Sequence, residues 1–393
     1  MRLSFLAASL LVFTQLVACG DGPLRPTLRI DARRVGDRAP VPGLVFALDH
    51  AGGRVEGVTD ANGVAVVAAP DWSAGSVDLT YGGDASRTLV SLLGIPRTET
   101  LTVEVETPHV RKVHGSFLNR LSQNSQLRLA AADIGSSLYG SFGSMGYDLE
   151  LDSTAATRLI GVEADASGGW PRFLKWFSVP VAAGTPGSDT NVDIDIAAAQ
   201  SVPSKKLTTT VDLPNAEMWF VQTNTGGGPA WLGAAVSGMR LSNGPRYQWE
   251  AEVAEPEGVT PMTMFLGSSD RSTFSMKTLV GLPRETETLT DLLPPPQLAS
   301  TTFDATRTTV QLTAVPDGVD RTGAIIAGRS AGEWRVEALD HRAALTVPAP
   351  PMGISDPRRS PGGAFGQAFF CAGYMAPTLC SRFAMSSGFG LTN

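Results

Sequence analysis

Apolar and polar residues alternate one by one along many short stretches of this chain. The alternation is strict at residues 101–106 and 191–196, and similar patterns occur at 208–213, 246–253 and 308–313. A period of two places apolar side chains on one face of an extended strand and polar ones on the other. Long segments with a helical period are nearly absent. The pattern therefore predicts an all-β protein with no helix of consequence.

Stretches rich in glycine and proline separate the predicted strands. Short strands with such turns are typical of β-sandwiches, so we expect several small antiparallel β-sandwich domains in series. The domains are expected at 27–107, 108–203, 204–296 and 297–393. One larger unit over 108–296 is the alternative.

A partial repeat supports this division. LVSLLGIPRTETLT at 89–102 is similar to LVGLPRETETLT at 279–290, and each copy precedes a stretch containing proline. Proline stiffens a connection between domains. We interpret both copies as the last strand of a sandwich running into a linker.

The first module contains a turn motif. APVPGLVFAL at 39–48 is followed by GVTDANGVAV at 57–66. Asp60 and Asn62 can bond their own backbone and Gly63 accepts a positive φ, so the motif predicts a tight turn between two strands. A calcium loop is the weaker interpretation, because the later acidic ligands are missing. The module resembles the carboxypeptidase-regulatory-like domain and, nearly as well, the Ig-like repeats of invasin-type bacterial proteins. Both resemblances imply an accessory β-sandwich.

The chain begins with a pattern typical of export. A short basic start at 1–2, with Arg2, and a short apolar run at 3–13 precede LVAC at 16–19. The run is shorter than the roughly 20 residues needed to span a bilayer. LVAC resembles the lipobox of bacterial lipoproteins, which implies a cleaved signal peptide at 1–18, lipid on Cys19 and a tether at 19–26. An ordinary signal peptide with a chance cysteine is the alternative. Gly20 after the cysteine favours the outer membrane, at its periplasmic face or the cell surface.

Composition narrows the partners. The 393 residues carry a net charge of −7 and are 42% hydrophobic, enough for packed cores. An acidic chain with few lysine clusters is a poor candidate for nucleic acid. The expected partners are the membrane, through lipid on Cys19, and an envelope protein or polysaccharide. Cys371 and Cys380 are expected to form a disulfide in an oxidising compartment, since two cysteines alone do not make a zinc site.

Motifs for catalysis are missing from the sequence. It has no P-loop, no HExxH and no nucleophile elbow. His109 and His114 lie five residues apart, which points them to opposite faces of a continuous strand. Asp193 and Asp195 share a strand face, but their apolar neighbours are expected to take the core. We therefore expect no catalytic residue, no metal site and no cofactor.

An aromatic cluster is the candidate binding patch. Trp170, Phe173 and Trp176 gather in a chain with only 7% aromatic residues. Such a group can stack on sugars or anchor a protein interface. The competing interpretation is that it packs in a core.

Together these features favour a membrane-anchored, non-catalytic lipoprotein that binds or scaffolds at the cell envelope. One alternative is a hydrolase of envelope or extracellular polymers with an active site that no motif reveals. The other is a structural subunit of an outer-membrane complex.

Overall fold

A computed structural model describes residues 27–391, apart from 36–37, 69, 109, 132–138, 143–144, 152–153, 166–171, 213–216, 225–233, 237–238, 241–245, 255–261, 269–272, 283, 304–307, 329–331, 362 and 377–378. In these residues the chain is built from strands, and the one helical turn is the 3₁₀ segment Pro357–Arg359. The all-β prediction is confirmed. None of the helical structure described is long and apolar enough to cross a membrane.

Sandwich 1 sets a topology that the rest of the chain repeats. Its first, fourth and seventh strands form one sheet, in the order β4-β1-β7, and the order β3-β2-β5-β6 forms the facing sheet. The strands are β1 (Thr27–Arg34), β2 (Val45–His50), β3 (Gly53–Val58), β4 (Val64–Ala68), β5 (Ser76–Gly82), β6 (Leu89–Pro96) and β7 (Thr100–Val105).

Sandwich 2 has the same order of strands. Its sheets run β11-β8-β14 and β10-β9-β12-β13, with β16 added beside β13 and β15 beside β8. The strands are β8 (Arg111–Leu118), β9 (Ser125–Ala131), β10 (Tyr139–Phe142), β11 (Gly146–Leu151), β12 (Thr157–Asp165), β13 (Arg172–Val181), β14 (Asp189–Asn191), β15 (Ile194–Asp195) and β16 (Gln200–Ser201).

Sandwich 3 repeats the order again. Its sheets run β21-β17-β24 and β19-β18-β22-β23, with β20 beside β21. The strands are β17 (Ser204–Asp212), β18 (Glu217–Asn224), β19 (Ala234–Val236), β20 (Met239–Arg240), β21 (Arg246–Ala254), β22 (Met262–Ser268), β23 (Phe274–Val280) and β24 (Thr286–Thr288).

Sandwich 4 departs from the repeat at one position. Its sheets run β25-β26-β29 and β28-β27-β30-β31, so β25 stands beside β26 where the other sandwiches have their seventh strand. The strands are β25 (Leu298–Phe303), β26 (Thr308–Leu312), β27 (Arg321–Gly328), β28 (Gly332–Ala338), β29 (Ala344–Val347), β30 (Ala364–Ala376), β31 (Leu379–Met385) and β32 (Phe389–Leu391), which pairs with β30.

The sheets are not purely antiparallel, in contrast to the prediction. In sandwiches 1 to 3 the closing strand runs parallel to the first one, as in the pairs β1–β7, β14–β8 and β17–β24. The partial sequence repeat covers the place where this happens, because each copy crosses from the sixth strand to the seventh, in the opposite sheet. Such a strand arrives from the facing sheet rather than from a hairpin, so it can run parallel.

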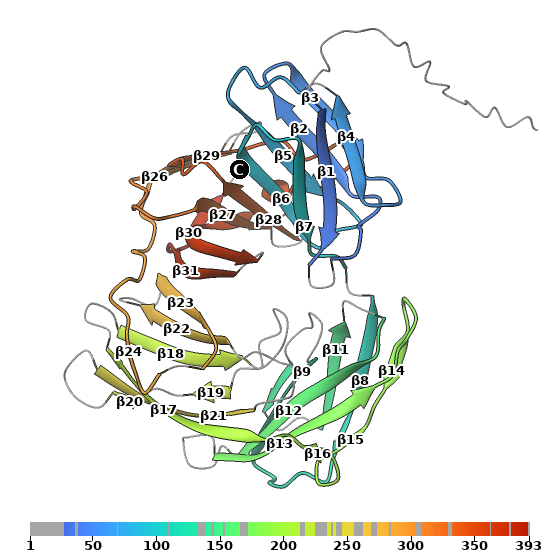
Figure 1. Cartoon of the computed structure of the whole chain (residues 1–393), viewed down its shortest axis with the longest axis vertical. Coiled ribbons are helices and arrows are strands. Elements are labelled where there is room, and N and C mark those ends of the chain that lie inside the picture. Colours follow the sequence, from blue (N-terminus) through green and yellow to red (C-terminus); the bar gives the residue numbers. More distant parts are fainter. Residues whose placement is uncertain are drawn as a thin grey trace, which may run out of the picture.

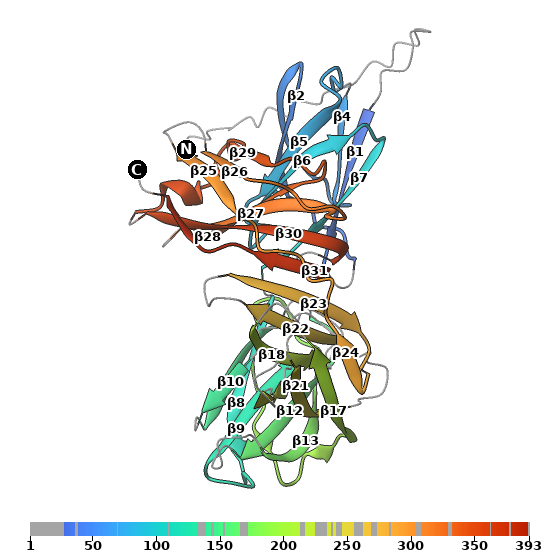
Figure 2. The ribbon, with the colours of Figure 1, turned by 90° about the vertical axis from the view of Figure 1, so that its left-hand side faces the viewer.

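One 13-stranded sheet joins three of the four sandwiches. β23 of sandwich 3 pairs antiparallel with β31 of sandwich 4, and β28 of sandwich 4 pairs parallel with β6 of sandwich 1. Sandwich 4, at the end of the chain, therefore lies between the third and first sandwiches, and Figure 1 shows the chain returning to its start. Seen from the side, β30 and β31 stack between sandwich 1 above and β23 below (Figure 2).

Strand β6 contributes to two hydrophobic cores. Leu92 and Ile95 pack in the core of sandwich 1, whereas Leu89 and Leu93 pack with Trp334 in the core of sandwich 4. The indole Nε1 of Trp334 donates a hydrogen bond of 3.0 Å to Oγ of Ser91. Sandwiches 1 and 4 are therefore joined by backbone pairing and by shared apolar packing.

Candidate functional site

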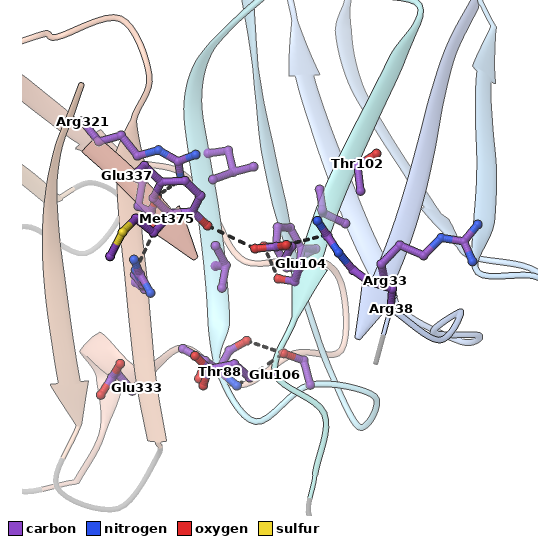
Figure 3. A pocket seen from close by; sticks show the side chains of 17 residues that line it. Arg33, Arg38, Thr88, Thr102, Glu104, Glu106, Arg321, Glu333, Glu337 and Met375 are labelled. Atoms are coloured by element: carbon purple, nitrogen blue, oxygen red, sulfur yellow. Dashed lines mark hydrogen bonds and ion pairs between the residues drawn. The ribbon is translucent and has the colours of Figure 1, made fainter. Parts of the chain in front are cut away.

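A cavity of about 610 Å³ lies where sandwich 1 meets sandwich 4 (Figure 3). Strands β1, β5, β6 and β7 contribute residues from sandwich 1, and β27, β28 and β30 contribute from sandwich 4. Its lining combines two tyrosines and a few apolar side chains with four arginines and four glutamates: Arg33, Arg38, Glu104, Glu106, Arg321, Glu333, Arg335 and Glu337.

The parallel register between β28 and β6 creates the charged wall. Along β28, Trp334 and Val336 enter the core of sandwich 4, so the residues that alternate with them point to the opposite face. Arg335 pairs with Val90 of β6, and Glu337 pairs with Leu92. Sandwich 1 covers this face, and the Arg335 and Glu337 side chains are only 7% and 4% exposed.

A buried ion network occupies this wall. The guanidinium of Arg321 lies 2.5 Å from a carboxylate oxygen of Glu337, and Nε of Arg335 forms an ion pair with the other oxygen. One carboxylate thus serves two arginines and leaves a positive charge in the wall. Buried charges of this kind persist only when they are paired, because desolvation penalises each of them.

Tyr374 links the network to the opposite wall. The guanidinium carbon of Arg321 lies 3.3 Å from the centre of its ring, and its hydroxyl donates a hydrogen bond of 3.4 Å to Glu104 of β7. Arg38 also forms an ion pair with Glu104. Burial raises the pKa of Tyr374 to about 12, although the nearby Arg321 partly opposes this. The phenol is therefore a neutral hydrogen-bond donor at neutral pH.

Glu106 and Glu333 make the other end of the cavity acidic. Desolvation in the cavity wall raises the pKa of Glu333, and the negative charge of Glu106 raises it further. Figure 3 shows the two side chains on either side of Thr88. Neither glutamate forms an ion pair with any residue that the structure describes. This end can accept a cationic group.

The predicted aromatic patch is wrong at Trp176. Its side chain is 3% exposed, and Phe173 is half-buried and stacks on it with ring centres 6.1 Å apart. The next two residues of β13, Phe177 and Ser178, are also buried, so the strand is covered on both faces at Trp176. Trp170 lies outside the described residues. Trp176 therefore packs in the interior, which is the competing interpretation for this one residue.

The two remaining cysteines of the predicted set are paired. Cys371 in β30 and Cys380 in β31 form a disulfide with Cα atoms 5.6 Å apart. Both are buried in an apolar cluster with Met276, Phe369 and Phe383. The bond therefore supports the hairpin next to the junction with sandwich 3. Cys19 lies outside the described residues.

The polar residues considered in sandwich 2 stay at the surface. Nδ1 of His114 lies 2.6 Å from a carboxylate oxygen of Asp189, and both side chains are exposed. Asp193 accepts a hydrogen bond from the Ser116 amide, and hydrogen bonds from the Ala198 amide and then from Asn119 lower the pKa of Asp195. His109 lies outside the described residues, within which no group of three or more potential ligands could hold a metal ion.

The predicted turn in sandwich 1 is confirmed. Oδ1 of Asp60 accepts hydrogen bonds from the amides of Asn62 at 2.8 Å and Val64 at 2.9 Å. Gly63 has a φ of +72°. Asp60 is thus engaged with its own backbone, as an Asx turn requires.

The sequence did not predict the cavity, because the charged strand β28 has the alternation of an ordinary strand with one face in water. Alternation in GEWRVEA predicts that Glu333, Arg335 and Glu337 face water. The signal that could have found the site is LVSLLGIP at β6, which is apolar on both faces. A strand of this kind is covered on both sides.

The sequence matches no protein-family model, and no characterised protein matches it in sequence. Among solved structures, the chain is similar to the Bacillus anthracis TIE protein at 12% identity and a TM-score of 0.20, over 65% of this chain and 45% of that one. It is similar to BcpA, the major pilin subunit of Bacillus cereus, at 10% identity and a TM-score of 0.18, over 92% and 94%. It is also similar to the shaft pilin SpaA of Lactobacillus rhamnosus GG, at 11% identity and a TM-score of 0.16, over 42% of this chain and 96% of that one. Scores this low carry no argument about function.

Proposed function

We propose that this chain is an exported, lipid-anchored, non-catalytic scaffold of the bacterial cell envelope. The observation that carries the scaffold role is the continuous sheet through sandwiches 3, 4 and 1. Strand pairing holds neighbouring sandwiches far more firmly than a flexible linker would, and β6 adds a shared core. A protein built in this way presents its surfaces in a fixed arrangement.

The membrane anchor rests on the LVAC motif at 16–19, and the outer membrane on Gly20. The resemblance of 27–107 to carboxypeptidase-regulatory-like and bacterial Ig-like domains supports an accessory role. The disulfide Cys371–Cys380 fits an oxidising compartment outside the cytoplasm. In this proposal the four sandwiches stand outside the cytoplasm, tethered at their N-terminal end.

Metabolic labelling with a lipid analogue tests the anchor. Wild-type protein should take up the label and partition into membranes, whereas Cys19→Ser should lose both properties. The double variant Cys371→Ser/Cys380→Ser is the matched control and should keep both. If Cys19→Ser is still labelled and still membrane-bound, the anchor is wrong.

Distances between spin labels test the scaffold. Val66 on sandwich 1 and Val280 on sandwich 3 are 63% and 67% exposed, so labels there should not disturb the cores. In detergent-solubilised full-length protein, the distance between them should be narrowly distributed, because one sheet connects the two sites. A distribution as broad as that of domains on a flexible linker contradicts the scaffold.

The second candidate function is hydrolysis of an envelope or extracellular polymer. It is favoured by two neighbouring carboxyl groups in the cavity, Glu106 and Glu333, of which one has a raised pKa. Such pairs can divide acid and base roles. Incubation with cell-wall and polysaccharide substrates, comparing wild type with Glu333→Gln, decides between the functions. Turnover that disappears in the variant would replace the scaffold by the enzyme.

A further inference from the structure

We propose that the cavity between sandwiches 1 and 4 binds an extended peptide. The peptide adds as a strand to the free edge of β7 and directs a basic side chain to Glu106 and Glu333. This inference extends the proposed function, because it names the class of partner that the scaffold would hold.

One edge of strand β7 is open in part. Among the described strands it pairs with β1. The amides of Arg29 and Val35 donate to the carbonyl oxygens of Glu99 at 2.9 Å and Val105 at 3.1 Å, so the odd-numbered residues of β7 face β1. Backbone groups alternate in direction along a strand. Those of the even-numbered residues, Thr102 and Glu104 among them, point away from β1.

Most of this edge is already engaged near its ends. The hydroxyl of Thr98 donates to the carbonyl oxygen of Thr100 at 2.9 Å, and that of Tyr81 donates to the carbonyl oxygen of Glu104 at 3.1 Å. Thr102 lies between them, lines the cavity and is exposed. Its backbone N–H and C=O find no partner among the described residues. These two groups are what a neighbouring strand would bond.

The cavity gives the added strand a floor. Val90 and Leu92 of β6 line it where β6 pairs with β28. Figure 3 shows β7 standing opposite the strands of sandwich 4, with the cavity side chains between them. A strand beside β7 would extend the sheet β4-β1-β7 across this junction. Ligand pockets range over about 300–1,000 Å³, and the cavity of about 610 Å³ falls within that range.

The charges of the cavity walls predict which side chains such a peptide should carry. At one end, Arg321 and Arg335 share Glu337 and leave a net positive charge. At the other end, neither Glu106 nor Glu333 forms an ion pair with a described residue, and the charge of Arg335 only partly opposes the rise in the pKa of Glu333. A lysine or arginine side chain would supply the missing partner, and an acidic side chain there would be repelled.

The aromatic residues of the cavity argue against a sugar. Sugars stack on open aromatic faces, but Arg321 covers the ring of Tyr374 with its guanidinium carbon 3.3 Å from the ring centre. Tyr81 is only 3% exposed. The cavity therefore offers a backbone edge and charges rather than a stacking surface.

Peptide binding to the full-length protein tests the inference. The probe is a blocked pentapeptide of alternating valine and lysine, and the control has glutamate in place of lysine. The lysine peptide should bind at least about tenfold more tightly, since a charge-assisted hydrogen bond contributes roughly that factor. N-methylation of the amides on one edge of the peptide should abolish binding, and N-methylation on the other edge should leave it intact.

Variants of the protein locate the site. Thr102→Pro removes the outward N–H but spares the pairing with β1, and it should abolish binding. Glu106→Gln/Glu333→Gln should weaken binding of the lysine peptide by about tenfold or more, whereas Glu99→Gln, at an exposed glutamate outside the cavity lining, should not. Each variant must unfold at the same temperature as wild type. If the lysine peptide still binds tightly to Thr102→Pro and to Glu106→Gln/Glu333→Gln, the inference is wrong.

Two other results would also overturn it. One is binding of an oligosaccharide but no peptide at millimolar concentration, and the other is recovery of the peptide in cleaved form, which would favour the enzyme. Neither the lipid labelling of Cys19 nor the distance between sandwiches 1 and 3 depends on the peptide. A failure of the peptide site is therefore distinguishable from a failure of the anchored scaffold.

Discussion

Individual side chains in this protein are constrained most where one sandwich touches another. Arg335 and Glu337 occupy alternate positions that would face water in an isolated sandwich, yet both are buried. Their pairing offsets a desolvation cost that a surface pair would not meet. In the same way, Ser91 is buried because it accepts the indole N–H of Trp334 and lies 2.8 Å from the hydroxyl of Thr80. The directional contacts of these polar residues thus help to set how sandwiches 1 and 4 are positioned against each other.

The Asx turn makes a prediction at Gly63. A Cβ there would lie 2.7 Å from both the carbonyl oxygen of Ala32 and the amide nitrogen of Val41, at a φ of +72°. Gly63→Ala should lower the free energy of unfolding by about 2–4 kcal/mol, from φ strain together with the clash. Gly75 has a φ of +82° and nothing within 4 Å, so Gly75→Ala isolates the strain and should cost about 1 kcal/mol. If urea denaturation shows the same loss of unfolding free energy for both variants, the clash at Gly63 makes no contribution.

Tyr374 makes a prediction about alkaline pH. Its pKa in the folded protein is about 12, above the value of about 10 in an unfolded chain. The stability linked to this group is therefore complete below about pH 10 and is lost as the pH rises toward 12. Tyr374→Phe should lose stability less steeply over that interval, as measured by urea denaturation at several pH values. An unchanged slope would refute the assignment.

At the scale of strands, periodicity in the sequence was informative wherever a strand has one buried face. β26 alternates in burial along TTVQL, as its residues predict. Predicted and observed strands also overlap at β7, β17 and β21. The segment 191–196 is the exception, because its alternation is divided between β14 and β15, which both pair with β8.

Strands with two buried faces lack this alternation, so the sequence did not predict how they pack. β6 and β12 are buried on both faces, and the sequence does not say what covers the second face. The same limit explains the incorrect prediction at Trp176, where β13 is also buried on both faces. A partner strand about 240 residues away, such as β28 for β6, leaves no local signal.

The hairpin β30–β31 makes a prediction about the disulfide. Residues nine apart are joined, so loss of the bond should lower the free energy of unfolding by about 2–3 kcal/mol in the chain-entropy model. Cys371→Ala/Cys380→Ala keeps the site apolar and should show this loss in denaturant unfolding. Because both cysteines are 1% exposed, mild reductant should leave the native bond intact. Rapid labelling of thiols in the folded, reductant-treated protein would contradict this burial.

At the scale of the whole molecule, sandwich 2 differs from the other three. Its strands pair among themselves, whereas sandwiches 1, 3 and 4 share a sheet. Sandwiches 1 and 4 should therefore open together, and sandwich 2 should open separately.

Hydrogen exchange can test this division with two matched variants. Leu312→Ala in sandwich 4 and Leu149→Ala in sandwich 2 each remove a buried side chain, at a cost of about 2–5 kcal/mol. Leu312→Ala should speed amide exchange in β6 of sandwich 1, because the two sandwiches share a core. Leu149→Ala should leave exchange in β6 unchanged. An effect of equal size from both variants would show that the sheet is not the unit of stability.

The pairing of β28 with β6 also has a consequence for how the protein folds during synthesis. Ser91 precedes its partner Trp334 by 243 residues, so β6 emerges from the ribosome, and from any export channel, long before β28. Until then its outer edge is unpaired, and Leu89 and Leu93 are uncovered, which is a template for misassembly. A β28 strand from a second chain would fit the same edge. High concentration during refolding should thus yield exchanged dimers, in which each chain completes the other's first sandwich.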